Sequence, residues 1–197
     1  MVIFILIENI KENHMENIKI IKNGVRILRP NEIKVIIESI PKVDHKDKLE
    51  ALLYTGCRYT ELRWLYTHQD AFQGQTILMP SMKPEARHKQ RYIRLNANGT
   101  RAITYFLRSK HNLPNHPGWD ENLIRWCKKA HIEKEGVCCK TTRKTWESWL
   151  ATMYPNNFQQ IFLSQGHTEK VSMEYYLMLP FNNQDKQDMK FYTDGWI

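Results

Sequence analysis

The sequence predicts a mainly helical α+β domain with one small antiparallel sheet, and three observations indicate it. Apolar residues recur at helical spacing along most of the chain. Between residues 76 and 95 the spacing changes to two short strand-like segments. No strand–helix–strand alternation, repeat or low-complexity block occurs. The 197 residues, 42% of them hydrophobic, are enough for one domain with a real core.

The first thirty residues are interpreted as an N-terminal arm or linker, because they are rich in Ile, Asn and Lys and show no clear period. The opening MVIFILI is apolar over only seven residues, which is too short for a membrane span, and it lacks a basic region or cleavage site. We therefore expect a cytoplasmic protein with no membrane partner. The domain is expected to cover residues 31–197.

The first helix of the domain is expected to follow Pro30, with Asn31 as its cap and isoleucines forming a buried stripe up to residue 40. A second helix is predicted at residues 45–55, ending at Gly56, and a third is expected near Tyr59. Arg58 then lies at a junction between two helices. Such a junction can direct a long side chain away from the packed body, although a surface or capping arginine is the commoner case.

Two strands, TILMP and RYIRL, are predicted around a basic loop with the sequence SMKPEARHKQ. The loop could be simply solvated, could follow a phosphate backbone, or could insert a lysine beside a leaving oxygen. No aromatic residues alternate with its charges, so a single-strand stacking platform is not indicated. The basic residues in question are Lys83, Arg87, Lys89 and Arg91.

The remaining chain reads as helices near residues 100–109, 119–131, 141–154, 157–164, 169–178 and 184–192. In the helix after Lys140, Arg143 lies one turn before the buried stripe that Trp146 begins. A charge on that side needs a carboxylate or phosphate partner. Because positions three apart share a helix face, Lys140 and Arg143 can reach one anion together, unless they form only a solvated face.

Two further residue types could carry chemistry near the C-terminus. His167 follows Gly166 at an expected turn, where a histidine is more often structural than catalytic. Tyr175 and Tyr176 are neighbours on a short helix, so one could pack in the core while the other projects. Each of these signals is weak on its own.

Composition limits the kind of partner. The formal charge is +8 with a pI near 9.3, which favours a polyanion. The four cysteines, Cys57, Cys127, Cys138 and Cys139, show no zinc spacing and are interpreted as reduced intracellular thiols. No metal or nucleotide cofactor is expected.

Taken in order, these motifs resemble the catalytic domain of the tyrosine recombinases, the phage-integrase family. The match runs over residues 31–197: TGCRYTEL carries the first arginine as Arg58, KTTR carries the second as Arg143, and SQGH carries His167. The family's tyrosine normally falls nine residues after this histidine, which selects Tyr176 over Tyr175. The ending SQGHT…YYLMLPF…GW resembles the integrases of archaeal viruses and plasmids, mobile elements, and of their chromosomal remnants.

The resemblance implies metal-independent cleavage and rejoining of double-stranded DNA through a 3′-phosphotyrosyl intermediate. Tyr176 would be the nucleophile, with Arg58 and Arg143 on the phosphate oxygens. Lys140 and His167 would add donors. Lys83 would protonate the departing 5′ oxygen. DNA contacts are expected from Arg87, Lys89, Arg91 and Lys144, with no small-molecule substrate.

The chain departs from the family pattern in three ways. Lys140 replaces the histidine of the usual H-x-x-R box and is a poorer proton shuttle at neutral pH. The basic loop is long, so Lys89 competes with Lys83. The first thirty residues leave no room for the family's N-terminal DNA clamp. The resemblance also implies a tetramer on DNA, in which the tail from about residue 182, with an exposed Trp196, docks on a neighbouring protomer; packing on its own chain is the alternative.

Three functions therefore compete. The first is an active site-specific recombinase or integrase. The second is a DNA-binding integrase remnant, or half of a split integrase, that lacks the clamp and cannot recombine alone. The third is a DNA-relaxing enzyme similar to type IB topoisomerases, which shares the chemistry but needs no exchanged tail.

Overall fold

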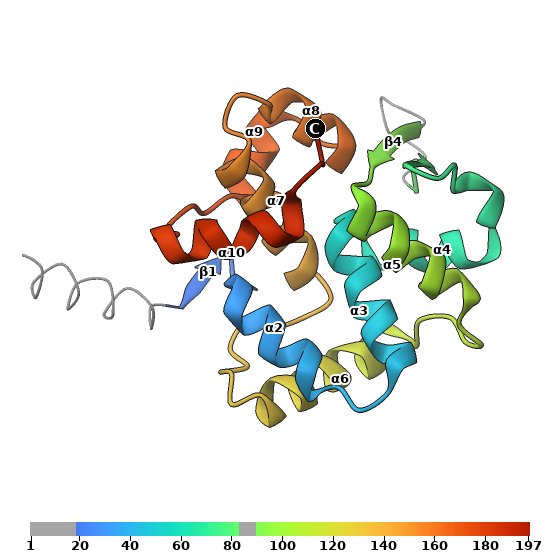
Figure 1. The fold of residues 1–197 in the computed structure, drawn as a ribbon, viewed down its shortest axis with the longest axis horizontal. Helices are drawn as coiled ribbons and strands as arrows, with labels where there is room; N and C mark the ends of the chain where they lie inside the picture. Colours follow the sequence, from blue (N-terminus) through green and yellow to red (C-terminus); the bar gives the residue numbers. More distant parts are fainter. Residues whose placement is uncertain (1–18, 83–89) are drawn as a thin grey trace, which may run out of the picture.

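The computed structural model describes residues 19–82 and 90–197 as helices around one central helix, with two small hairpins (Figure 1). The central helix is α7 (Thr141–Met153), in which every residue from Thr141 to Ala151 is buried. It packs against helices α3, α8 and α10 and against strand β2. A mainly helical α+β fold is confirmed.

The first helices follow the sequence prediction with one correction. Helix α2 (Pro30–Ser39) begins at Pro30 itself, and its cap is Arg29, whose backbone N–H donates to the Glu32 side chain at 2.7 Å. The expected cap, Asn31, lies inside the helix, because proline is well suited to the first helical position. Helix α3 (Val43–Thr55) ends at Gly56, which adopts the left-handed conformation with φ 58°, as predicted. Helix α4 (Tyr59–Thr67) follows, then a 3-10 turn (Gln69–Ala71).

The predicted strands form an antiparallel pair, β3 (Thr76–Pro80) and β4 (Gln90–Arg94), with Ile77 opposite Ile93. Their buried face packs toward α8. The expected loop residues Lys83, Arg87 and Lys89 lie outside the described residues, so their predicted roles are untested.

Five further helices occur in the described residues. They are α5 (Ala97–Arg108), α6 (His116–Lys129), α8 (Phe158–Gln165), α9 (Glu169–Val171) and α10 (Asn183–Thr193). The single helix expected at residues 169–178 is instead the short α9 followed by a π-helical turn, η2 (Ser172–Tyr176). The Leu177 N–H donates to the Ser172 carbonyl at 3.0 Å, five residues earlier, which is the hydrogen bond of a π-turn.

The assignment of residues 1–30 to an arm is wrong for residues 20–30. Strands β1 (Ile20–Lys22) and β2 (Val25–Ile27) form a hairpin whose Ile20 and Ile27 belong to the core. Leu28 follows β2 directly in sequence. Its N–H donates to the Thr145 hydroxyl and its carbonyl accepts from the Trp149 indole, each at 3.0 Å. These bonds join the hairpin to the central helix.

The expectation of an exposed Trp196 is also wrong. Trp196 is 1% exposed, and its indole N–H donates to the Arg94 carbonyl at 3.1 Å. Helix α10 packs on α7 and α2, and its Asp185 forms a buried ion pair with Arg29. In this structure the tail packs on its own chain, which is the alternative that the sequence left open.

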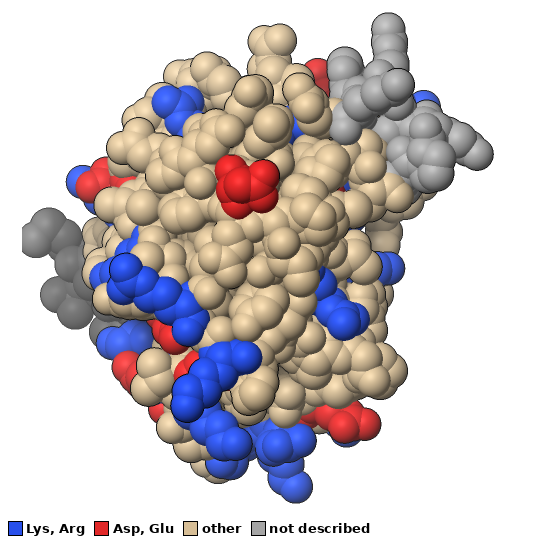
Figure 2. Space-filling model, turned by 90° about the vertical axis from the view of Figure 1, so that its right-hand side faces the viewer, with Lys and Arg blue, Asp and Glu red and all other residues tan. Residues whose placement is uncertain are grey.

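Charge is unevenly distributed over the surface. On the face shown in Figure 2, Lys and Arg side chains gather toward the lower edge, while the centre carries few charges. Within the described ranges, no helix is both long and apolar enough to cross a membrane.

Candidate active site

Three cationic or titratable side chains surround the ring of Tyr176. The Arg143 guanidinium carbon lies 5.3 Å from the ring centroid and the Lys144 Nζ lies 5.7 Å from it. The His167 ring stacks on the tyrosine ring, with centroids 4.6 Å apart and planes tilted by 21°. Arg143 and Lys144 come from the first turns of α7 and His167 from the loop after α8. Residues that are up to 33 positions apart in sequence thus meet at one phenol.

The two adjacent tyrosines differ in their surroundings. Tyr176 is half-buried at the end of the π-helical turn, whereas Tyr175 is 47% exposed. A side-chain hydrogen bond with Glu174 raises the pKa of the Tyr175 phenol. The cationic groups therefore surround Tyr176, the tyrosine selected by its distance from His167.

Arg143 is almost completely buried, as its position on the helix predicted. Its partners are two backbone carbonyls: Nη1 donates to Gly56 at 2.6 Å and Nη2 donates to Gln165. Those carbonyls lie at the C-terminal ends of α3 and α8, where helix dipoles favour a cation. Burial, and then the nearby charge of Arg58, lower the pKa of Arg143. Arg143 thus joins three helices at the site.

Arg58 and Arg91 are joined by one carboxylate. Glu61 has no exposed side-chain surface and accepts from Arg58 Nη1 at 2.7 Å and from both terminal nitrogens of Arg91 at 2.8 Å. Burial raises the pKa of Glu61, but hydrogen bonds and charge from Arg91 outweigh it and lower this pKa to about 2. Arg58 keeps 37% of its side chain exposed, whereas Arg91 keeps 11%. Arg91, expected to contact DNA, is here bound inside the protein.

The two lysines of the KTTRK segment have different environments. Lys140 is exposed at the cap of α7. Lys144 is 5% exposed, and its Nζ donates to the Lys22 carbonyl at 2.7 Å, so this expected DNA contact holds the β1–β2 hairpin in the structure. Burial, and then the charge of Lys140, lower the pKa of Lys144. Of these two, Lys140 is the one presented to solvent.

Both ring nitrogens of His167 are engaged inside the protein. Nε2 lies 3.0 Å from Glu147 Oε2, and Nδ1 lies 2.9 Å from the Ser172 hydroxyl. The same hydroxyl lies 2.6 Å from Glu147 Oε1. In this arrangement neither ring nitrogen is free to bond a phosphate oxygen, which differs from the role expected for His167.

The turn that carries His167 requires a glycine. Gly166 has φ 74°, and a Cβ there would lie 2.5 Å from Arg91 Cδ. Arg91 Nε also donates to the Ser164 carbonyl at 3.0 Å. The Glu61–Arg91 pair therefore fixes the backbone immediately before His167 as well as the side chain of Arg58.

Sequence reasoning missed three residues of this site: Glu147, Ser172 and Asn23. The first two form the network around His167. The Asn23 side-chain amide donates to the Glu174 carbonyl at 3.1 Å, so the β1–β2 turn contacts the segment that carries Tyr176. The dipeptide Asn23–Gly24, with φ 49° and 70°, is a strong hairpin signal that could have revealed this turn.

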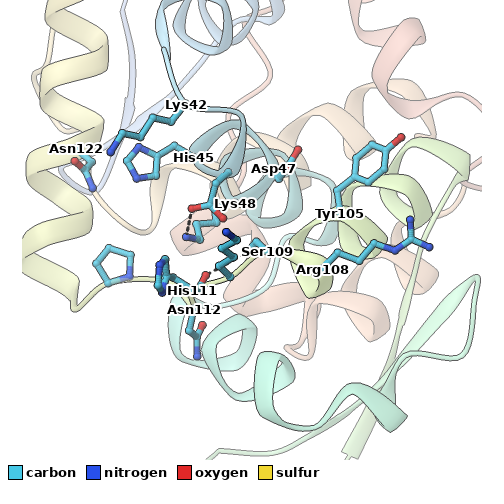
Figure 3. Close-up of a pocket in the computed structure, with 13 residues that line it drawn as sticks. Lys42, His45, Asp47, Lys48, Tyr105, Arg108, Ser109, His111, Asn112 and Asn122 are labelled. Atoms are coloured by element: carbon cyan, nitrogen blue, oxygen red, sulfur yellow. Dashed lines mark hydrogen bonds and ion pairs between the residues drawn. The ribbon is translucent and has the colours of Figure 1, made fainter.

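A pocket in the described part of the chain lies elsewhere. It has a volume of about 790 Å³ between the start of α3 and the loop after α5, and it contains none of the catalytic residues expected from the sequence (Figure 3). Lys42, Arg108 and Lys110 give it basic groups, while Lys48 is paired with Asp44. In residues 19–82 and 90–197 no cluster of three metal-binding side chains occurs, and the four cysteines are free.

Comparison with known proteins supports the fold. A crystal structure of XerA recombinase superposes with a TM-score of 0.61 at 20% identity, over 85% of this chain and 65% of that one. The chain thus spans about two thirds of that protein. No protein-family model and no curated protein matches the sequence. The similarity establishes that the chain shares the fold of that protein.

Proposed function

We propose that this protein cleaves and rejoins double-stranded DNA through a covalent bond between Tyr176 and a 3′ phosphate. The observation that carries the proposal is the meeting of Arg143, Lys144 and His167 around the Tyr176 ring. Positive groups beside a phenol favour negative charge on its oxygen as it attacks. The recombinase-like fold and the order of motifs support the same chemistry.

The reaction exchanges one ester for another. Tyr176 Oη loses its proton and bonds to phosphorus, while the bond from phosphorus to the 5′ oxygen breaks and that oxygen takes up a proton. Lys83, outside the described residues, is the proposed proton donor, with Lys89 as the alternative. Rejoining is the reverse attack by a 5′ hydroxyl. Because the phosphotyrosyl bond retains the ester energy, no nucleotide is consumed.

Phosphate binding is assigned to the arginines and to Lys140. Arg58 keeps 37% of its side chain exposed, and Glu61 orients its guanidinium. It can therefore donate to a non-bridging oxygen while it keeps its bond to Glu61. Lys140, exposed at the N-terminus of α7, adds charge where the helix dipole also favours an anion. Arg143 would contact the phosphate through N–H groups that its two carbonyl bonds leave unused, among them Nε–H.

A second candidate is a DNA-binding protein of the same fold that does not cleave. Arg143 uses both terminal nitrogens on the Gly56 and Gln165 carbonyls, and His167 uses both ring nitrogens on Glu147 and Ser172. If these contacts persist on DNA, His167 offers no ring nitrogen to the scissile phosphate. An active recombinase, by contrast, requires the unused N–H groups of Arg143, which is 3% exposed, to reach that phosphate.

Trapping of the covalent adduct tests the proposal. The protein is incubated with supercoiled plasmid and with a library of nicked duplexes, then denatured and examined for DNA-linked protein. Wild type and Tyr175→Phe are expected to form the adduct, whereas Tyr176→Phe is expected to form none. Salt-dependent DNA binding without any adduct would instead establish the second candidate.

The same assay separates the remaining alternatives. Plasmid relaxation without strand exchange would identify activity similar to that of a type IB topoisomerase. Recombinant products from paired duplexes would identify a site-specific recombinase. The tetramer expected on DNA is part of the proposal and is measured by the mass of the complex. An adduct with Tyr176→Phe that is lost in Tyr175→Phe would reassign the nucleophile.

A further inference from the structure

Glu147, Ser172 and His167 form a closed ring of three hydrogen bonds beneath Tyr176. The distances are 2.6 Å from the Ser172 hydroxyl to Glu147 Oε1, 3.0 Å from His167 Nε2 to Glu147 Oε2, and 2.9 Å between Ser172 and His167 Nδ1. Glu147 and Ser172 are fully buried, and the His167 side chain is 5% exposed. None of the motifs read from the sequence includes Glu147.

Counting protons assigns the direction of each bond. The hydroxyl of Ser172 has one proton, and its short contact with the carboxylate oxygen uses it. The Ser172 oxygen can then only accept, so His167 Nδ1 must donate to it. The ionised carboxylate also accepts from Nε2. Both ring nitrogens are therefore donors, and the ring carries both protons. A neutral histidine could complete the same ring only if Glu147 were protonated.

We propose that Glu147 is a positioning residue that, with Ser172, holds His167 as a doubly protonated ring stacked against the Tyr176 phenol. This inference rests on the proposed function of Tyr176 as nucleophile. The doubly protonated imidazole of His167 places a positive charge beside Tyr176, with the centroids of the two aromatic rings 4.6 Å apart. His167 then acts on the nucleophile through its ring face.

The geometry around the network favours this role. Glu147 lies on α7 one turn after Arg143, so one buried helix supplies both the arginine near Tyr176 and the carboxylate beneath it. Ser172 opens the π-helical turn that ends at Tyr176, and its carbonyl accepts from the Leu177 N–H. The network thus sets the charge of the His167 ring and the start of the turn that carries the nucleophile.

The other groups facing His167 do not replace Glu147. Arg143 and Lys144 approach the Tyr176 ring from α7 and are cations, so they oppose a charged histidine. The Phe162 ring of α8 lies 6.4 Å from His167 and is apolar. Glu147 is therefore the carboxylate that hydrogen-bonds the His167 ring and can compensate its charge, because burial makes an uncompensated charge costly.

Nitrogen NMR of the histidine ring tests the charge state without any reaction. At pH 7.5 the hydrogen-bond geometry leads us to expect two protonated ring nitrogens for His167 in wild type. Glu147→Gln is nearly isosteric and can still accept from Ser172, but its amide cannot balance a cation. We expect this variant to show one unprotonated ring nitrogen. A neutral ring in wild type would overturn the proposal.

Adduct kinetics test the consequence for Tyr176. At saturating DNA, Glu147→Gln is expected to slow adduct formation by up to about 100-fold, the size that a small misplacement of a reacting group can have. Its Kd for DNA should stay within about twofold of wild type, because Glu147 is fully buried. The matched control is Glu32→Gln, which removes the carboxylate of a buried ion pair with Arg26 away from Tyr176. This control should keep the wild-type rate.

The two readouts separate failure of this inference from failure of the proposed function. If wild type forms no adduct but the NMR signature is present, the function fails and the charged network remains. If wild type forms the adduct and Glu147→Gln matches its rate, the positioning role is overturned. Equal slowing by Glu32→Gln would also overturn it, because loss of any buried carboxylate would then have the same effect.

Discussion

The Glu61 carboxylate bonds the Arg91 guanidinium with both of its oxygens, at 2.8 Å each. This bidentate pair joins β4 to the first turn of α4, where the same carboxylate also receives Arg58. Because Glu61 is completely buried, it could not remain ionised there without these partners. The orientation of Arg58, the partly exposed arginine of the site, therefore depends on a carboxylate that no solvent reaches.

We expect Glu61→Gln to lower the free energy of unfolding by about 3–5 kcal/mol, the usual cost of removing one partner from a buried ion pair. The amide leaves both arginines without a counter-charge. Urea unfolding at pH 7 measures the change. Glu38→Gln, on the exposed part of α2, is the control and should stay within about 0.5 kcal/mol of wild type.

The same pair predicts a pH dependence. The pKa of Glu61 is lowered to about 2 in the folded protein from an ordinary value of 4.5. The contribution of the ionised Glu61 to the free energy of unfolding is therefore fully present above pH 4.5, and it is lost as the pH falls from 4.5 toward 2. The stability difference between wild type and Glu61→Gln should shrink over that window. A difference that stays constant down to pH 2 would contradict the assignment.

Gly166 gives a prediction that separates backbone strain from steric contact. Gly166 and Gly195 have nearly equal φ values, 74° and 71°. A Cβ at Gly166 would meet Arg91 Cδ at 2.5 Å, whereas at Gly195 nothing lies within 4 Å. Arg91 cannot easily move, because Glu61 and the Ser164 carbonyl hold it.

Gly195→Ala should therefore lower the free energy of unfolding only by the strain of the left-handed backbone, about 1–2 kcal/mol. Gly166→Ala should cost more than this and should also slow adduct formation, because it displaces Arg91 and the turn before His167. Unfolding curves of both variants under the same conditions give the comparison. If the two variants lost the same free energy of unfolding, Arg91 would not pack against this turn in solution.

The sequence predicted most helices because their apolar stripes are local. The burial of Arg143 followed from its position one turn before Trp146, and the end of α3 followed from Gly56. The two carbonyl partners of Arg143 could not be predicted. Gly56 and Gln165 lie 87 and 22 residues from Arg143 in sequence, and only the tertiary fold brings their carbonyls to its guanidinium. The selection of Tyr176 over Tyr175 came from family spacing rather than from a local pattern.

What the sequence did not reveal depends on long-range contacts. Glu147 looked like an ordinary helix residue, since nothing local shows that His167 and Ser172 pack on it. The β1–β2 hairpin was missed because three-residue strands have no measurable period, although Asn23–Gly24 marked its turn. Trp196 was expected to be exposed, yet it is buried beside β4, and its contact with Arg94 spans 102 residues of sequence.

Lys140 and Lys144 should differ in their effects on DNA binding. Lys140 is exposed, so Lys140→Ala is expected to weaken DNA binding and to reduce the slope of log affinity against log salt by about 1. Lys144 is buried on the Lys22 carbonyl, so Lys144→Met should leave that slope unchanged. Titrations at several salt concentrations measure both. A lower slope for Lys144→Met would show that this lysine leaves the hairpin to bind DNA.

The tail gives a final prediction about packing. Trp196 is 1% exposed and lies against the Tyr154 ring, with centroids 6.1 Å apart, while its indole donates to the Arg94 carbonyl. Trp196→Ala should lower the free energy of unfolding by about 3–5 kcal/mol, because it leaves a large cavity and an unpaired carbonyl. Phe191, 69% exposed on α10, is the matched aromatic control, and Phe191→Ala should be nearly neutral. If Trp196→Ala leaves the monomer's stability unchanged in dilute solution, the tail is not packed on its own chain, and docking on a neighbouring protomer becomes the better account.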